Sequence, residues 1–263
     1  ARFRGEENET TLDIYFGVPP KQVAIENERG HVERLLVLTN KEGQTLYRTK
    51  ASMKFAIDDS SQLRDGAFVP EIATLNVSPG SYKLAVQVTD QLSDKWGLYV
   101  QELEVPAFGD SLAMSDLEMA WQIGEKSMDE KFRKGDVWVM PMPSRHYLTD
   151  QSVYVYYEVY NLTRDEFGQT RYKVNYTIQQ DLRSGFGVFG ALGAGFKSLI
   201  ASGKPQVTVS YDREGRDLSE PIYLELDINK VKPGLNQVTV TVTDLVSRQS
   251  VTKQAMFQLS PAQ

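Results

Sequence analysis

The chain has 263 residues, a formal net charge of −6 and no cysteine. The lack of cysteine excludes disulfides and thiolate metal sites, and the acidic balance argues against nucleic-acid binding, which needs a basic face. No segment reaches the roughly 18–20 apolar residues that span a bilayer.

Alternating apolar and polar residues dominate the first hundred positions and predict β-strands. In "SYKLAVQVTD" (81–90), Val86 and Val88 share the apolar face, so we expect both in the core. One apolar and one polar face are typical of antiparallel sheets with one buried side. The strands of this half are expected to begin near Leu12, Gln22, Glu33, Leu46, Ile72, Tyr82 and Leu98.

The segment "PAFGDS" (106–111) combines Pro and Gly in a short polar run and predicts a joint between two domains. The predicted organisation is a first β-sandwich at 1–106, a linker at 107–113 and a second β-sandwich at 114–263. Strands of the second half are expected near Leu117, Val137, Val153, Tyr172, Val207, Ile222, Val238 and Thr252.

A row of tyrosines alternates with core valines in "SVYVYYEVY" (152–160). Tyr154, Tyr156 and Tyr160 should therefore lie on the outer side of their sheet. Tyrosine has an apolar body and a polar tip and is enriched at interfaces, so we interpret the row as a partner-docking surface. Coverage by neighbouring loops or by the first domain is the equal alternative.

A glycine-rich apolar segment, "RSGFGVFGALGAGFKSLIASG" (183–203), carries no charge from Gly185 to Phe196. It is too short to cross a membrane, and its glycines disfavour an isolated helix. Exposed apolar patches usually mark contacts, so the segment is a candidate for docking to a protein or to the bilayer interface. The alternative is that it folds back over its own sandwich. The candidate docking residues are Phe186, Val188, Phe189, Leu192, Phe196, Leu199 and Ile200.

An internal repeat links the two halves. "SPGSYKLAVQVTDQLS" (78–93) matches "KPGLNQVTVTVTDLVS" (232–247) with a constant shift of 154 residues. A Pro-Gly turn precedes a strand in each copy, and Asp90 and Asp244 recur at the next turn, where Asp side chains bond the backbone. The repeat predicts an all-β fold of two tandem antiparallel sandwiches of immunoglobulin or fibronectin type III style, with a closed barrel as the weaker alternative. Val240 and Val242 are expected in the second core.

Catalytic chemistry has little support in the sequence. The two histidines, His31 and His146, fall in different predicted domains, which disfavours a histidine metal site or a Ser-His-Asp triad. Ser144 lies near His146 without a further partner. The G-x-G in the apolar segment lacks the strand–turn–helix context of a phosphate loop. We therefore expect no catalytic residue, no cofactor and no metal site.

Several pieces of the chain resemble the C-terminal part of bacterial GWxTD-domain proteins. These pieces are "TLDIYFGVP" (11–19), "LNVSPGSYKLAVQVTDQLSDKWG" (75–97), "LAMSDLEMA" (112–120), "FRKGDVWVMPMPSRHY" (132–147), "VYVYYEVYNLTRDEFGQTRYKVNYTI" (153–178) and "KPQVTVSYDREG" (204–215). Together they cover more than half of the chain. The Gly-Trp-x-Thr-Asp motif itself is absent, so the resemblance is to the β-rich C-terminal portion alone.

The resemblance implies an exported protein without established catalytic residues. The family is common in a bacterial group that includes phototrophs, where membrane-extrinsic polypeptides hold reaction centres and antenna rings together. The chain starts at Ala1 without a basic-then-apolar signal stretch, so a targeting or anchoring segment was removed or lies outside this numbering, or else the protein is cytosolic.

Three functions stay open at this point. The first is a non-catalytic extracytoplasmic scaffold, periplasmic and peripheral to a membrane, that docks onto a membrane protein complex. A reaction centre–light-harvesting complex of a phototroph is one such complex. The second is a glycan- or peptide-binding module of the cell envelope, and the third and least favoured is an enzyme with an unusual carboxylate site.

Overall fold

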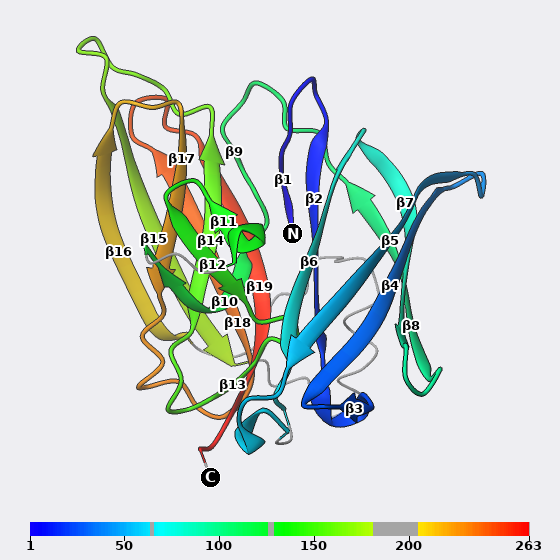
Figure 1. Ribbon diagram of the computed structural model, residues 1–263. Coiled ribbons are helices and arrows are strands. Elements are labelled where there is room, and N and C mark those ends of the chain that lie inside the picture. Colours follow the sequence, from blue (N-terminus) through cyan, green and yellow to red (C-terminus); the bar gives the residue numbers. More distant parts are fainter. Residues whose placement is uncertain (64–65, 126–128, 181–204, 263) are drawn as a thin grey trace.

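The computed structural model describes residues 1–63, 66–125, 129–180 and 205–262 (Figure 1). The protein is all-β. Its strands form four sheets, two from residues 2–105 and two from residues 113–260. No described helix is long and apolar enough to cross a membrane. The helices of the described ranges are single 3-10 turns, η1 (Pro20–Gln22), η2 (Ser60–Leu63) and η3 (Glu130–Phe132).

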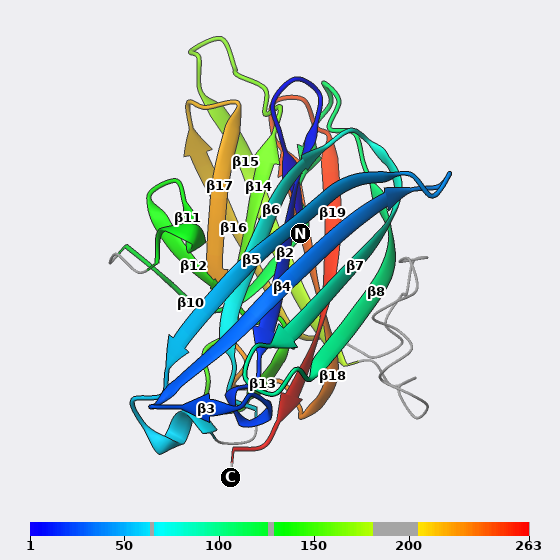
Figure 2. The same cartoon turned by 45° about the vertical axis from the view of Figure 1, so that its right-hand side comes forward.

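The first half of the chain forms sheets A and B. Sheet A has the order β1-β2-β6, and sheet B has the order β5-β4-β7-β8, with β3 added beside the start of β4. Figure 2 shows the four long strands of sheet B side by side. The strands are β1 (Arg2–Arg4), β2 (Thr10–Val18), β3 (Ile25–Glu26), β4 (Arg29–Asn40), β5 (Thr45–Ala56), β6 (Val69–Val77), β7 (Gly80–Asp90) and β8 (Trp96–Val105).

The strand expected near Gln22 is wrong, because residues 20–22 form η1. Pro19 precedes η1 and Pro20 is its first residue, and a proline fixes φ and lacks the backbone N–H that a β-ladder needs.

The second half forms sheets C and D. Sheet C has the order β11-β12-β10-β14-β17, with β9 also paired to β14, and sheet D has the order β13-β19-β18-β15-β16. Described pairs are antiparallel except β13 with β19. The strands are β9 (Ala113–Met114), β10 (Glu118–Gly124), β11 (Arg133–Lys134), β12 (Val137–Pro141), β13 (His146–Leu148), β14 (Tyr154–Tyr160), β15 (Thr170–Gln180), β16 (Pro205–Gly215), β17 (Ser219–Glu225), β18 (Gly234–Asp244) and β19 (Ser250–Ser260).

The two halves share one order of strand pairing. β1-β2-β6 corresponds to β10-β14-β17, and β5-β4-β7-β8 corresponds to β16-β15-β18-β19. The register agrees as well, since Ala85 pairs with Val100 and Thr239 pairs with Gln254, which are 154 residues further along. The repeated sequence segments therefore occupy corresponding places in sheets B and D.

The repeated aspartates build the same turn twice. The Asp90 carboxylate accepts the backbone N–H of Leu92 at 3.0 Å and of Ala24 at 2.8 Å. The Asp244 carboxylate accepts the N–H of Val246 and of Thr163, both at 2.8 Å. Burial opposes ionisation of both acids, yet these hydrogen bonds hold the pKa of each below its usual value. Each aspartate thus ties its turn to a distant segment.

Each half has its own core between its two sheets. Val86, Val240 and Val242 are buried, as expected from the alternation. Val88 is only partly buried, which corrects that expectation. Its cross-strand partner is Gly97, which has no side chain to cover it.

The four sheets stack in the order B, A, C, D, and Figure 1 shows β1, β2 and β6 between sheet B and the second half. Phe3 of β1 packs into a small cluster with Ala120, Val137, Val139 and Tyr156 of sheet C. Sheet A therefore buries one face against sheet B and the other against sheet C, which fixes the two halves against each other.

Candidate functional site

The tyrosine row lies on the face of sheet C that meets sheet A. Tyr156 and Tyr160 are buried, and Tyr154 is partly buried. The Phe3 ring lies 6.0 Å from the Tyr156 ring, and the backbone N–H of Arg4 donates to the Tyr160 hydroxyl at 3.0 Å. The structure thus has the first domain covering these tyrosines, the alternative weighed from the sequence. Within this chain, Tyr156 and Tyr160 serve the contact between the halves.

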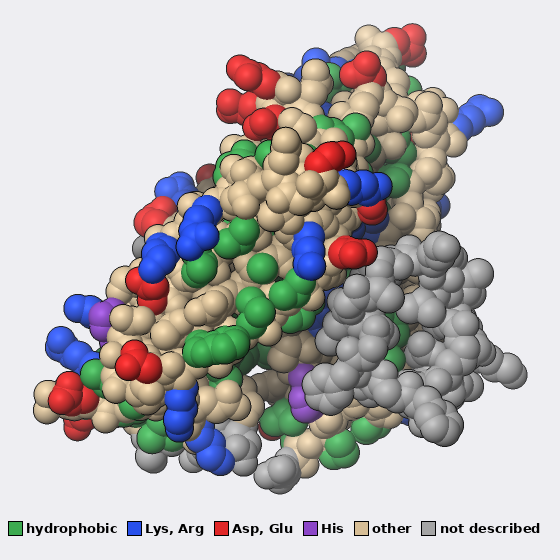
Figure 3. All heavy atoms as spheres, turned by 90° about the vertical axis from the view of Figure 1, so that its right-hand side faces the viewer, with side chains coloured by type: hydrophobic (Ala, Val, Ile, Leu, Met, Phe, Trp, Pro, Cys, Tyr) green, Lys and Arg blue, Asp and Glu red, His purple; other side chains and the backbone are tan. Residues whose placement is uncertain are grey.

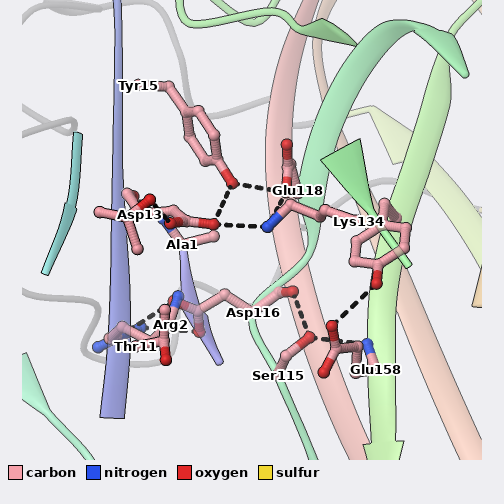
Figure 4. A network of polar contacts seen from close by, with 12 residues as sticks. Ala1, Arg2, Thr11, Asp13, Tyr15, Ser115, Asp116, Glu118, Lys134 and Glu158 are labelled. Carbon is pink, nitrogen blue, oxygen red and sulfur yellow. Dashed lines mark hydrogen bonds and ion pairs between the residues drawn. The ribbon is translucent and has the colours of Figure 1, made fainter. Parts of the chain in front are cut away.

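A polar group, here called the junction cluster, lies at the same contact and consists of Asp13, Tyr15, Glu118 and Lys134 (Figure 4). The Lys134 ammonium lies 2.5 Å from a carboxylate oxygen of Asp13 and 3.4 Å from one of Glu118. The Tyr15 hydroxyl lies 2.6 Å from Glu118 and 3.1 Å from Asp13. The cluster joins β2 of the first half to β10 and β11 of the second.

The junction cluster is buried, and its charges compensate one another only in part. Burial raises the pKa of Glu118, and Lys134 opposes this only in part. Burial also disfavours ionised Asp13, but Lys134 and the Thr74 hydroxyl together hold the pKa of Asp13 below its usual value. The two carboxylates raise the pKa of Lys134 against the effect of burial.

Two acids bridged by a lysine and a tyrosine could act as an acid–base pair in an open site. Here Asp13 is 5% exposed and Glu118 is 2% exposed. The amine and the tyrosine hydroxyl are both directed at these two acids, so the cluster works as a polar tie between the halves. Asp116 forms a second tie, with Arg2 at 2.5 Å and Lys253 at 3.3 Å. The hydrogen bond and charge of Arg2 outweigh burial and hold the pKa of Asp116 at about 2.

The two histidines lie apart, and each bonds a serine rather than a second catalytic or metal-binding side chain. The imidazole Nε2 of His146 lies 2.8 Å from the Ser260 hydroxyl, whereas the Ser144 hydroxyl accepts the backbone N–H of His146. His31 bonds Ser52 in the first half. Among the described residues, no group of three or more His, Asp or Glu side chains could hold a metal ion.

A cleft of about 2890 Å³ opens between the two halves. Gly97, Tyr99 and Gln101 of β8 line one side, and Arg145 and Lys253 line the other. Among the described residues, the inner face of sheet B extends past sheet A, so that Val88 lines the cleft and packs only partly against the core.

The outer face of sheet B carries a second feature, an apolar band, that sequence reasoning missed. Figure 3, which looks onto this face, shows hydrophobic side chains in a band across it. Trp96 is 64% exposed, Leu98 55% and Val100 43%. The register places Leu35 and Val37 of β4 and Ala85 of β7 on the same face. This apolar band is made of Leu35, Val37, Ala85, Trp96, Leu98 and Val100.

The corresponding face of sheet D is polar at every one of these positions. The register aligns Trp96, Leu98 and Val100 with Ser250, Thr252 and Gln254. Leu35, Val37 and Ala85 correspond in the same way to Asn175, Thr177 and Thr239. The same sheet is therefore built elsewhere in this chain without the band, so the fold does not require it. This difference between the two faces could have been found in the sequence. Extending the 154-residue shift beyond the segment 78–93 aligns the apolar residues of 96–100 with the polar residues of 250–254.

The candidate docking residues of the glycine-rich segment lie outside the described residues. These are Phe186, Val188, Phe189, Leu192, Phe196, Leu199 and Ile200. Docking through them stays a prediction.

The comparisons with known proteins give weak similarities. No family model matches the chain, and no curated protein matches it. Among solved structures, the chain is similar to Bacteroides uniformis beta-glucuronidase at 11% identity and a TM-score of 0.31. That match covers 95% of this chain and 26% of that one. A calcium-binding mutant of Bacteroides uniformis beta-glucuronidase 2 gives 10% identity and a TM-score of 0.29, covering 97% and 27%. The chain thus spans about a quarter of these proteins.

Proposed function

We propose that the protein is a non-catalytic, extracytoplasmic scaffold that docks onto a membrane protein complex. The observation that carries the proposal is the apolar band on the outer face of sheet B, set against the polar face of sheet D. Exposed apolar patches rimmed by polar residues mark interaction sites. The band has such a rim, since exposed Arg48 and Lys50 of β5 lie beside it.

The polar contacts between the halves fit this role. The junction cluster and the Asp116 tie both join the first half to the second, and a scaffold must keep its contacts at a fixed spacing. The two buried acids of the junction cluster bind Lys134 and Tyr15 at the contact between the halves, which favours a structural function over a catalytic one. From the resemblance to the GWxTD-domain proteins we take two further parts of the proposal. The compartment is the periplasm, and the partner is a reaction centre–light-harvesting complex.

Rebinding to stripped native membranes tests the proposal. The variant carries Trp96→Ser, Leu98→Thr and Val100→Gln, the residues that sheet D already has at these positions, so its fold should persist. Burying the exposed parts of the three side chains contributes about 3 kcal/mol, so rebinding should weaken roughly a hundredfold. The matched control is Phe167→Ser, which removes an 80% exposed ring away from sheet B.

Rebinding of the triple variant at wild-type strength would refute docking through the apolar band. Equal weakening by Phe167→Ser would show that any exposed apolar residue matters, which would also refute it.

A glycan- or peptide-binding module of the cell envelope is the second candidate. The specific observation in its favour is the open cleft between the halves, with Tyr99 on one wall and Arg145 on the other.

A further inference from the structure

Arg145 has an unusual position for a charged residue. It ends the turn that follows Met142, with its N–H bonded to the Met142 carbonyl at 2.9 Å and its own carbonyl bonded by the N–H of Gln258 at 2.8 Å. Its φ is 51°, in the left-handed region that favours glycine. A glycine would hold this turn at lower conformational cost, so the turn by itself does not call for an arginine.

The guanidinium of Arg145 lines the cleft and has no hydrogen bond or ion pair among the described residues. The nearest acid is Asp116, whose oxygens already bond Arg2 and lie near Lys253. Arg2 and Lys253 therefore already engage the carboxylate of Asp116, and no described side chain bonds the guanidinium of Arg145. Burial lowers the pKa of Arg145, which Asp116 offsets only in part. Arg145 is partly buried, and a partly buried arginine usually has a hydrogen-bond or ion-pair partner.

The opposite wall of the cleft is the edge of a sheet. β8 ends the order of sheet B, and its residues 96–100 are uncharged and exposed. Natural edge strands are usually guarded by charges or covered. β5, the other long edge of sheet B, has Arg48, Lys50 and Lys54 exposed, and the end of β19 is covered by β13. Among the described residues, nothing covers or guards residues 96–100 of β8 in this way, so their outer backbone N–H and C=O groups can pair with an added strand.

We propose that the cleft binds an extended, acidic segment of a partner protein. The segment adds as a strand to the edge of β8, and one of its carboxylates pairs with the guanidinium of Arg145. Strand addition is a common mode of peptide recognition, in which backbone hydrogen bonds supply affinity and side-chain contacts supply specificity. Arginine suits the second task because its planar fork matches a carboxylate with two parallel hydrogen bonds.

A polypeptide fits these observations better than an acidic glycan. Both offer carboxylates to Arg145, but only a polypeptide has the regular row of donors and acceptors that the edge of β8 can pair with. The inference goes beyond docking through the apolar band, because it concerns the backbone edge of β8 and the guanidinium of Arg145 rather than the outer face of sheet B.

Peptide binding to the purified chain in solution tests the inference. The probes are two fluorescent pools of blocked seven-residue peptides with Thr, Val, Ile or Tyr at six positions, and with Glu at the centre in one pool and Gln in the other. Anisotropy should show the Glu pool binding at least about tenfold more tightly, as expected for a hydrogen bond to a charged group. The variants Arg145→Gln and Arg145→Gly should abolish that difference, and Arg145→Lys should restore part of it.

Arg248→Gln is the matched control, since Arg248 also has a positive φ, of 62°, but is exposed and lies outside the cleft lining. It should bind both pools like the wild type. Arg145→Gly also relieves the left-handed backbone, so unfolding should not explain its loss of preference for the Glu pool.

Three results would overturn the inference: no binding of either pool, equal binding of both pools, or undiminished preference in Arg145→Gln. Binding of an oligogalacturonate instead of the peptides would assign the cleft to acidic glycans. None of these results depends on membranes, so a failure here is distinguishable from a failure of the rebinding experiment.

Discussion

Replacing Lys134 by methionine removes the cation that, among the described residues, pairs with both acids of the junction cluster. Its ammonium lies 2.5 Å from Asp13 and 3.4 Å from Glu118, and its side chain is 13% exposed. Methionine retains most of the volume, so Phe3, whose ring centroid is 3.8 Å from the ammonium, keeps a packing partner. The change therefore isolates the charge.

The expected loss of stability follows from the two acids left behind. Removing one partner of a buried ion pair typically costs about 3–5 kcal/mol, because the remaining charge is uncompensated. Tyr15 still donates to the cluster, so we expect about 3 kcal/mol at pH 7, the lower end of that range.

The loss should depend on pH in one direction. The folded pKa of Asp13 is lowered in the wild type, so Asp13 contributes stability above its unfolded pKa that is lost as pH falls through the folded pKa. The folded pKa of Glu118 is raised, so Glu118 costs stability as pH rises through that value. Without Lys134 both folded pKa values rise. The deficit of the variant is therefore largest at pH 7 and shrinks as pH approaches about 4.

Urea unfolding followed by tryptophan fluorescence at pH 7 and pH 4 measures this difference. The control is Lys50→Met, which breaks the exposed pair with Glu33 at 2.8 Å and should cost no more than about 1 kcal/mol. A deficit below 1 kcal/mol for Lys134→Met, or one equal at the two pH values, would show that the cluster does not tie the halves together.

Further predictions concern the cores, the turns and the apolar segment. Val240→Ala should cost about 1–3 kcal/mol in urea unfolding, and Val88→Ala should cost clearly less because it is half-covered. Asp244→Ala leaves backbone N–H groups without their acceptor and should cost about 1–3 kcal/mol at pH 7. That cost should shrink as pH falls through the lowered folded pKa of Asp244, and a cost that does not change with pH would contradict it. Serine replacements in the glycine-rich segment should reduce retention in the native membrane fraction, and full retention would refute docking by Phe186, Phe189 and Phe196.

Most of the β architecture could be predicted because alternation reports directly on which face of a strand is buried. Val240 and Val242 show this, and the aspartate turns follow from the repeat. Two local predictions were wrong, the strand near Gln22 and the burial of Val88. The first failed because of the prolines before Gln22 and the second because Gly97 has no side chain to cover Val88. Neither cause can be read from the alternation of apolar and polar residues.

The candidate sites were harder to predict because they join residues far apart in the chain. The junction cluster brings together residues 13, 118 and 134, and no spacing rule connects them. Arg145 belongs to no catalytic or binding motif, and its positive φ and the lack of a hydrogen-bond or ion-pair partner among the described residues distinguish it only in the structure. The burial of Tyr156 under Phe3 likewise required the packing of sheet A on sheet C.

Site-specific photocrosslinking tests the central claim, docking through the apolar band, most directly. A benzoylphenylalanine is placed at position 98 on sheet B and, in a matched sample, at position 252, the corresponding place on sheet D. After rebinding to native membranes and irradiation, position 98 should crosslink to an integral membrane polypeptide and position 252 should not. Crosslinks from position 252 alone, equal crosslinks from both, or none from position 98 would contradict the account.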